Sequence, residues 1–219
     1  MNKIVIDRRC PISEQTPEEE VLNVLTHGSG ALLCCWGFLN LLEVHLASAS
    51  FSQLLVFSVY ALAWIVLFST STLYHASSHL GRKAYLRVLD HCAIFTVIAA
   101  SYGPFVWHAL NDTKGYTLWF LSWFIAVGGC VFKIRSVYRY HVQSTWAYLI
   151  QGGMVLVSLP SLMAALSANA FTWLAVGGVA LSGGTYFYIR DDIKYNHCAW
   201  HCCVLLGCVG THIAVLDLL

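Results

Sequence analysis

The chain has 219 residues, of which 58% are hydrophobic and 11% are charged, and its formal net charge is +1. A soluble domain carries about 25% charged residues, so this chain has too little polar surface to cover a globule in water. The composition excludes an ordinary soluble domain and indicates an integral membrane protein. With no basic cluster, nothing indicates a nucleic-acid partner.

Residues 1–19 form a short polar segment without the apolar core of a cleavable signal sequence. At its end, Thr16 can cap a helix, Pro17 suits the first helical position and Glu19 completes a capping box. We therefore expect a short cytoplasmic N-terminal segment, 1–19, and a membrane domain, 20–219, whose first helix begins at the membrane surface.

A membrane-spanning helix needs about 20 mostly apolar residues. Seven segments meet this requirement, and the connections between them leave no room for a soluble domain. The fold class predicted is all-α, a bundle of seven transmembrane helices. Its spans are Val21–Val44, Gln53–His75, Val88–Ala109, Tyr116–Ile134, Trp146–Leu166, Ala170–Ile189 and His197–Leu218.

The basic residues predict the orientation, because Lys and Arg concentrate in cytoplasmic connections. Eleven of the twelve fall on one side of the seven spans, and only Lys114 falls on the other. The N-terminus is therefore predicted to be cytoplasmic and the C-terminus outside. The eleven are Lys3, Arg8, Arg9, Arg82, Lys83, Arg87, Lys133, Arg135, Arg139, Arg190 and Lys194.

Prolines, glycines and cysteines indicate how the helices pack. Pro104 and Pro160 should kink their helices. Close helix contacts are expected at four glycine pairs: Gly128-Gly129, Gly152-Gly153, Gly177-Gly178 and Gly183-Gly184. The nine cysteines are odd in number and mostly lie in apolar segments, which is typical of reduced packing residues. A thiolate ligand at Cys198 or Cys202, beside histidines, is the secondary interpretation.

Polar side chains gather at one depth near the predicted cytoplasmic face. Such groups are costly in hydrocarbon unless they are paired or face a cavity, so each is a functional candidate. Four of the predicted helices contribute them. They are Glu20, Asn23, His27, Ser71, His75, Asp90, His91, His197 and His201.

The spacing of the histidines within this set of polar residues predicts a metal site. His197 and His201 are four residues apart and share one helix face. Together with a third histidine, which could be His75, they would form a three-His zinc site with an open fourth position. Asp90 could then orient a water molecule or act as an acid or base.

The remaining polar residues have less specific interpretations. For Asn23 and His27 we expect inter-helix hydrogen bonds. His212 follows His201 by eleven residues and should face the interior about 16 Å further along the helix, too far to join the same metal. Glu43 and His45 are expected at the outer interface, and Arg82, Lys83 and Arg87 are interpreted as topology determinants.

Over residues 20–216 the chain resembles hemolysin III-type members of the progestin and adiponectin Q receptor family. The motifs that carry the resemblance are Asn23-x-x-Thr26-His27, Ser71-Thr72-Leu73-Tyr74-His75, Leu89-Asp90-His91 and His197-x-x-x-His201 followed by His212. The resemblance implies seven helices with the N-terminus inside, zinc held by His75, His197 and His201, and Ser71 and Asp90 beside the metal. Alkaline ceramidases in the wider superfamily imply zinc-dependent hydrolysis of a lipid amide.

Two functions remain open at this point. One is zinc-dependent hydrolysis of a lipid amide or ester by Ser71 and Asp90, with a fatty-acyl substrate in the bundle. The alternative is a receptor-like protein of membrane homeostasis that senses a lipid and uses zinc structurally. Cytolysis, which the family name suggests, would favour a soluble form or a releasable amphipathic segment, and the sequence shows neither. We expect the bacterial inner (plasma) membrane as the location.

Overall fold

The computed structural model describes residues 10, 12–45 and 49–219, and every secondary-structure element in them is helical. Lys3, Arg8 and Arg9 of the predicted topology set lie outside the described residues, as does the side chain of His45. The elements are α1 (Pro17–His45), α2 (Phe51–Ala76), α3 (Leu80–His108), α4 (Thr113–Ser136), α5 (His141–Gly153), the 3₁₀ helix η1 (Met154–Ser158), α6 (Leu159–Ala165), α7 (Ala168–Tyr188) and α8 (Asn196–Leu216).

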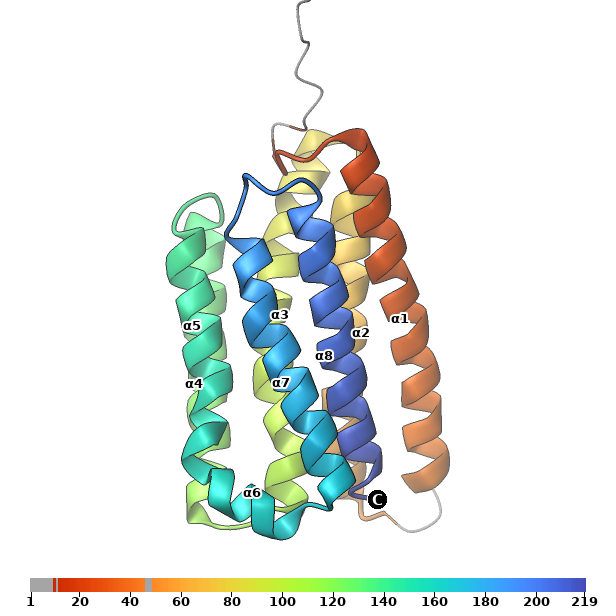
Figure 1. The fold of residues 1–219 in the computed structure, drawn as a ribbon, viewed down its shortest axis with the longest axis vertical. Coiled ribbons are helices and arrows are strands. Elements are labelled where there is room, and N and C mark those ends of the chain that lie inside the picture. The colour runs from red at the N-terminus through yellow and green to blue at the C-terminus, as the bar shows by residue number, and fades with distance from the viewer. Residues whose placement is uncertain (1–9, 11, 46–48) are drawn as a thin grey trace, which may run out of the picture.

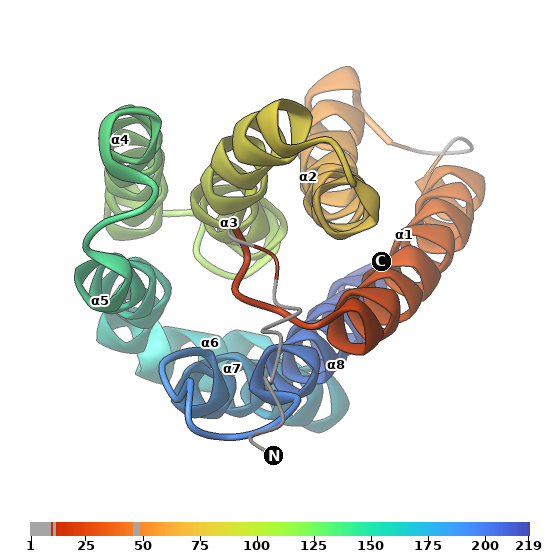
Figure 2. The same ribbon diagram turned by 90° about the horizontal axis from the view of Figure 1, so that it is seen from above.

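The long helices form a bundle in which neighbours along the chain run in opposite directions (Figure 1). Viewed from above, α1 packs on α2 and α2 packs on α3, while α8 lies against both α7 and α1 (Figure 2). The first and last helices are therefore neighbours, and this contact brings distant parts of the sequence together.

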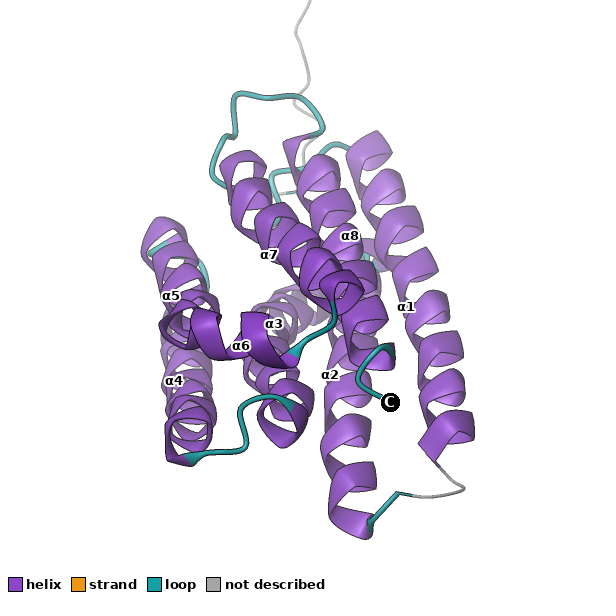
Figure 3. Ribbon diagram, turned by 60° about the horizontal axis from the view of Figure 1, so that its bottom comes forward, coloured by secondary structure: helices purple, strands orange, loops and turns teal. Residues whose placement is uncertain are grey.

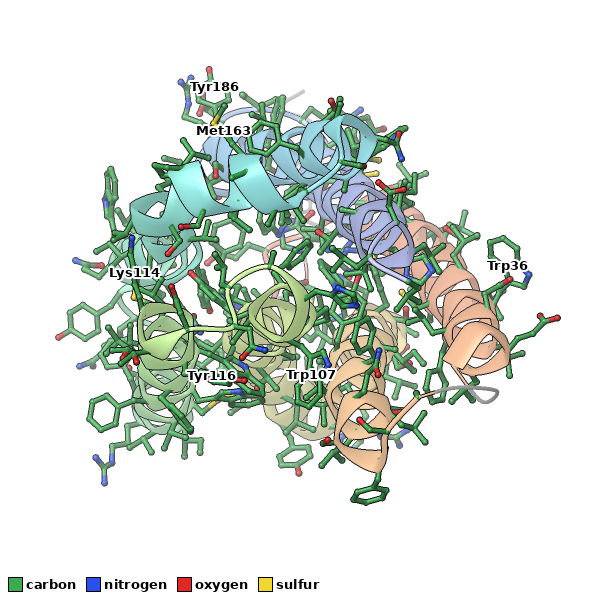
Figure 4. All side chains as sticks on the ribbon, turned by 90° about the horizontal axis from the view of Figure 1, so that it is seen from below. Trp36, Trp107, Lys114, Tyr116, Met163 and Tyr186 are labelled. Carbon is green, nitrogen blue, oxygen red and sulfur yellow. The ribbon has the colours of Figure 1, made fainter. Side chains whose placement is uncertain are left out.

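The outer surface of the bundle is apolar. Leu32, Phe51 and Phe124 are each at least 75% exposed, and Trp36 and Tyr186 project outward (Figure 4). The interior, by contrast, holds polar side chains such as Asn23, His75 and Asp90, which is the arrangement expected of a protein whose solvent is lipid. The described chain is an integral membrane protein.

Six helical stretches are long and apolar enough to cross a membrane, against the seven predicted. They are α1, α2, α3, α4, the stretch His141–Ala165, and α8. The difference is α7, which spans 21 residues without a charged side chain but contains four glycines and several polar residues. These residues lower its mean hydropathy.

The basic residues within the described part of the predicted set all lie at the end of the bundle where α1 begins (Figure 1). α3 begins at Leu80, earlier than the Val88 predicted, so Arg82, Lys83 and Arg87 belong to a helix and not to a connection. Lys133, also counted as a topology residue, is fully buried in the last turn of α4.

Pro160 breaks the predicted span Trp146–Leu166. The chain passes from α5 through η1 into the seven-residue α6, which begins one residue before the proline. Proline lacks the N–H that would continue the helical ladder, and its ring opposes the preceding turn. α6 consequently lies across the end of the bundle rather than along α5 (Figure 3).

Glycines allow α7 and α8 to pack closely. A Cβ at Gly177 would meet the Gly207 carbonyl oxygen at 3.0 Å, and one at Gly184 would meet Cys203 Cβ at 2.5 Å. In α4, Gly129 faces the Phe95 ring. One glycine of each of these three pairs thus makes the predicted contact. A Cβ at Gly152 or Gly153 would meet nothing within 4 Å, although the Gly152 carbonyl oxygen accepts from Tyr102 of α3 at 3.2 Å.

Candidate metal centre

Three histidines from two helices converge inside the bundle, near the end where α1 and α8 begin. His75 lies in the last turn of α2, and His197 and His201 lie in the first turns of α8. One ligand atom from each lies within 4.8 Å of the other two. His75 and His201 are 3% and 1% exposed and His197 is half-buried, so most of this group is closed to solvent. The structure therefore brings together the three histidines that the sequence predicts as metal ligands.

The start of α8 is fixed by a contact with α1. Tyr195, the residue before α8, has a left-handed backbone with φ of 60°, which is strained for a bulky side chain. Its N–H donates to Glu19 Oε1 at 3.1 Å, while Glu19 Oε2 accepts from the Thr16 N–H at 2.9 Å. The predicted capping box is confirmed, because the Glu19 N–H also donates to Thr16 Oγ1. The same carboxylate that caps α1 thus sets where α8, and with it His197, begins.

Hydrogen bonds to α1 orient two of the imidazoles. His75 Nδ1 lies 2.6 Å from Glu20 Oε2, and a carboxylate only accepts, so the ring proton is on Nδ1. Thr26 donates its hydroxyl proton to backbone carbonyls and therefore accepts from His201 Nδ1, at 3.2 Å. In both rings Nε2 keeps its lone pair.

This arrangement fits a metal ion. Nε2 of His75 is buried and has no hydrogen-bond partner among the described residues. A buried polar atom left in this way is costly unless it binds an ion or water. A histidine ligand whose other nitrogen donates to a carboxylate is the usual support of a metal site. The three histidines could accordingly hold one metal ion.

Lys83 is a site residue that sequence reasoning missed, whereas Glu20 is among the predicted polar candidates but without a specific role. Lys83 Nζ lies 2.9 Å from Glu20 Oε1 and donates to the Tyr74 and His75 carbonyl oxygens at 2.9 and 3.2 Å. Lys83 is only 2% exposed, so its interpretation as a topology determinant misses its structural role. The signal that was available is Glu20 itself, because a carboxylate at the predicted inner helix end is costly unless a cation such as Lys83 pairs with it.

Asn23 and His27 also contact the three histidines. The Asn23 amide lies 3.5 Å from His75 Nδ1, a long inter-helix contact. The His27 ring stacks on His201 with centroids 3.4 Å apart. Neither nitrogen of His27 has a hydrogen-bond partner within the described chain, so the expected inter-helix hydrogen bond is wrong for this residue.

Ser71 and Asp90 form a second polar group beside the histidines. Ser71 lies one turn deeper than His75 in α2, and its hydroxyl neighbours the buried Asp90 carboxylate of α3. His91 Nδ1 lies 3.7 Å from Asp90 Oδ2 but donates to the Arg87 carbonyl oxygen at 2.8 Å, and its Nε2 accepts from Tyr188 at 3.2 Å. Asp90 does not belong to the group of metal-ligand atoms.

Other candidates lie outside the group of three. The ligand atoms include neither Cys198 nor Cys202, and all nine cysteines are free thiols. His212 packs against Gly37 of α1, on the far side of the bundle interior, as its register predicts. Glu43 is exposed at the opposite end of α1.

A cleft of about 450 Å³ reaches this group from outside. Its walls include Glu20 and His75 at the inner end and the apolar side chains of Val21 and Leu25, which are 57% and 61% exposed. The cleft therefore reaches one predicted ligand, His75, and its walls are apolar at Val21 and Leu25 and polar at Ser77 and Ser78.

Comparison with known proteins is consistent with this architecture. The family described as "Haemolysin-III related" matches residues 15–212. The chain is 36% identical to the hemolysin-3 homolog of Bacillus subtilis (strain 168) over 92% of this chain and 94% of that protein. It is 34% identical to hemolysin-3 of Bacillus cereus, over 92% of each. It is 27% identical to the human monocyte to macrophage differentiation factor over 72% of this chain and 67% of that protein.

These relatives and the spanning helices indicate an integral protein of the bacterial plasma membrane. The chain belongs to the haemolysin-III related family, as a hemolysin III-type member of the progestin and adiponectin Q receptor family.

Proposed function

We propose that this protein binds one zinc ion through His75, His197 and His201 and hydrolyses an amide or ester bond of a membrane lipid. The observation that carries this proposal is the convergence of three imidazoles, two of which have Nδ1 held by α1 and Nε2 free. Three histidines leave a fourth coordination position open, which is the arrangement of catalytic zinc sites.

The topology that goes with this function has seven spans, with α7 as the sixth. α7 lacks charged side chains and packs against α8. With seven spans the basic end of the bundle is cytoplasmic, the C-terminus is outside, and the histidines lie in the inner leaflet.

The chemistry assigned to the chain is simple. When bound, zinc supplies a Lewis acid that polarises a carbonyl and activates water. Asp90 accepts a proton, and the Ser71 hydroxyl donates to the developing oxyanion or positions water. Glu20 holds the His75 ring in the tautomer that leaves Nε2 free. The acyl chain enters from the apolar wall of the cleft formed by Val21 and Leu25.

One observation favours the second candidate, a lipid-sensing protein in which zinc is structural. Asp90 lies outside the group of metal-ligand atoms, beside Ser71. In this alternative the metal joins α2 to α8, and a lipid in the cleft is recognised without being cleaved.

Metal content and lipid turnover, measured on the same sample, separate these functions. We expect about one zinc in the purified protein, and loss of most of it in His75→Ala, His197→Ala or His201→Ala, because two ligands cannot complete a tight shell. His212→Ala is the matched control and should keep its zinc. Equal zinc in the wild type and the His197→Ala/His201→Ala variant would exclude the site.

Turnover is followed by mass spectrometry of lipid amides and esters incubated with the protein, with and without chelator. Asp90→Asn should keep zinc and lose cleavage, and Ser71→Ala should be ~10–100-fold slower. A wild type that holds zinc but cleaves no lipid in the panel would favour the sensing function.

A further inference from the structure

Two lysines are buried in this bundle, and their surroundings differ. Lys83 Nζ has three acceptors, one from Glu20 and two from backbone carbonyl oxygens, and its charge is matched by the Glu20 carboxylate. All three N–H donors of Lys83 are therefore used. It has no capacity left for a ligand.

Lys133 is the opposite case. Its side chain, in the last turn of α4, is 0% exposed, and its Nζ has no hydrogen-bond partner within the described chain. The neighbouring thiols contact backbone and not Lys133: Cys130, one turn earlier, donates to the Cys92 carbonyl oxygen, and Cys92 donates to that of Cys130. An ammonium group with three unused donors is among the most costly groups that a membrane protein can bury.

The charges around Lys133 do not balance. Cys130, one turn before Lys133, contacts Cys92 of α3. Arg87 and Asp90 are the charged residues of α3 nearest to this contact, and no described carboxylate forms an ion pair with Lys133. Two cations therefore share one carboxylate in a region of low dielectric.

Nε of Arg87 is also buried without a partner, although Nη1 of the same guanidinium donates to the Ile12 carbonyl oxygen, and the Ser71 hydroxyl beside Asp90 has no hydrogen bond within the described chain. The cluster thus has unused donors and an excess positive charge, and both call for an anion.

We propose that Lys133 anchors a single anionic group, a phosphate or carboxylate, of a membrane lipid, with Arg87 and Ser71 as further donors. Lys133 lies three residues from the end of α4, about 4.5 Å along the axis, which is close to the level of lipid headgroups. This inference rests on the proposed function in one respect, because Ser71 and Asp90 belong to both sites. If Lys133 binds the acidic group, the substrate or sensed ligand is an acidic lipid.

The test uses the full chain in neutral detergent and lipids with brominated acyl chains, which quench tryptophan fluorescence. Phosphatidylglycerol and a free fatty acid carry the anionic group, diacylglycerol lacks it, and inorganic phosphate tests the free ion. We expect the acidic lipids to bind at least about tenfold more tightly than diacylglycerol. Lys133→Met should abolish this preference, and Lys133→Arg should retain it.

Arg135→Met is the matched control, because it removes the same charge from an exposed position two residues further along α4. An equal loss in Arg135→Met and Lys133→Met would reduce the effect to surface charge and overturn the proposal. So would a wild type without preference for acidic lipids, or a Lys133-dependent response to inorganic phosphate alone. If Lys133→Met does not fold, the wild-type preference and Lys133→Arg still decide. Zinc is measured on every sample, so a protein without zinc that still prefers acidic lipids contradicts only the metal site.

Discussion

Glu20 connects the histidines to the charged end of the bundle. It accepts from His75 Nδ1 with one oxygen and pairs with Lys83 through the other, and the Ser13 hydroxyl donates to it as well. A partner of this kind fixes the orientation of a ligand ring and raises its basicity, so it controls metal affinity without touching the metal.

Glu20→Gln should therefore weaken zinc binding about 10–100-fold. Glutamine keeps the shape and can still accept from His75, but it removes the negative charge and leaves Lys83 buried without its carboxylate. Competition with a chelator of known affinity measures the change. Glu43→Gln, at the exposed opposite end of α1, should bind zinc like the wild type; an unchanged affinity in Glu20→Gln would show that this carboxylate does not support the ligand.

At the residue scale, what the sequence can predict depends on how local the geometry is. His197 and His201 share a face through helical periodicity alone, so their pairing is predictable. The contact of Glu20 with Lys83 needs α3 to begin at Leu80, and the stacking of His27 on His201 needs the exact approach of α1 to α8. Both depend on tertiary packing, which no single segment encodes.

At the scale of the helices, the packing of α7 on α8 depends on close approach of their backbones. Gly210 lies against α7 so closely that a Cβ there would meet the Trp173 carbonyl oxygen at 2.6 Å and Gly177 N at 3.0 Å. Backbone atoms cannot move aside as a side chain can, so the helices themselves would have to separate.

We expect Gly210→Ala to destabilise the protein by about 1–3 kcal/mol, the usual cost of overpacking. Thermal unfolding in detergent gives the comparison. Gly178→Ala serves as the control, because a Cβ at Gly178 has no neighbour within 4 Å and alanine favours a helix. An unfolding midpoint in Gly210→Ala as high as in Gly178→Ala would contradict the proposed role of close packing.

The boundaries of the helices are likewise only partly predictable from the sequence. Apolar length locates six spans reliably, whereas α7 is ambiguous because the glycines that suit it to α8 also lower its hydropathy. Pro160 predicts a disturbance in the fifth span, but whether it gives a kink or a separate short helix depends on what packs around α6. The glycine pairs indicate contact faces, while only the packed bundle decides which member of a pair is used.

At the scale of the whole molecule, the distribution of basic residues predicts the orientation of the bundle. A reporter fused after Leu219 should read as outside and one inserted near Lys83 as cytoplasmic, because positively charged connections stay on the cytoplasmic side. Alkaline phosphatase and green fluorescent protein fusions in the intact chain measure this. If a fusion after Leu219 is cytoplasmic, an even number of spans is present and α7 does not cross.

The contact between α1 and α8 has a consequence for biosynthesis. Glu19 caps α1 and also accepts from Tyr195 at the start of α8, and α8 follows every other described helix in chain order. As the chain leaves the ribosome, His75 enters the membrane long before His197 and His201 are made. A metal ion at the proposed site would therefore bind only once the last helix has been inserted and has docked against the first, so its loading would be a post-translational step that reports completed assembly.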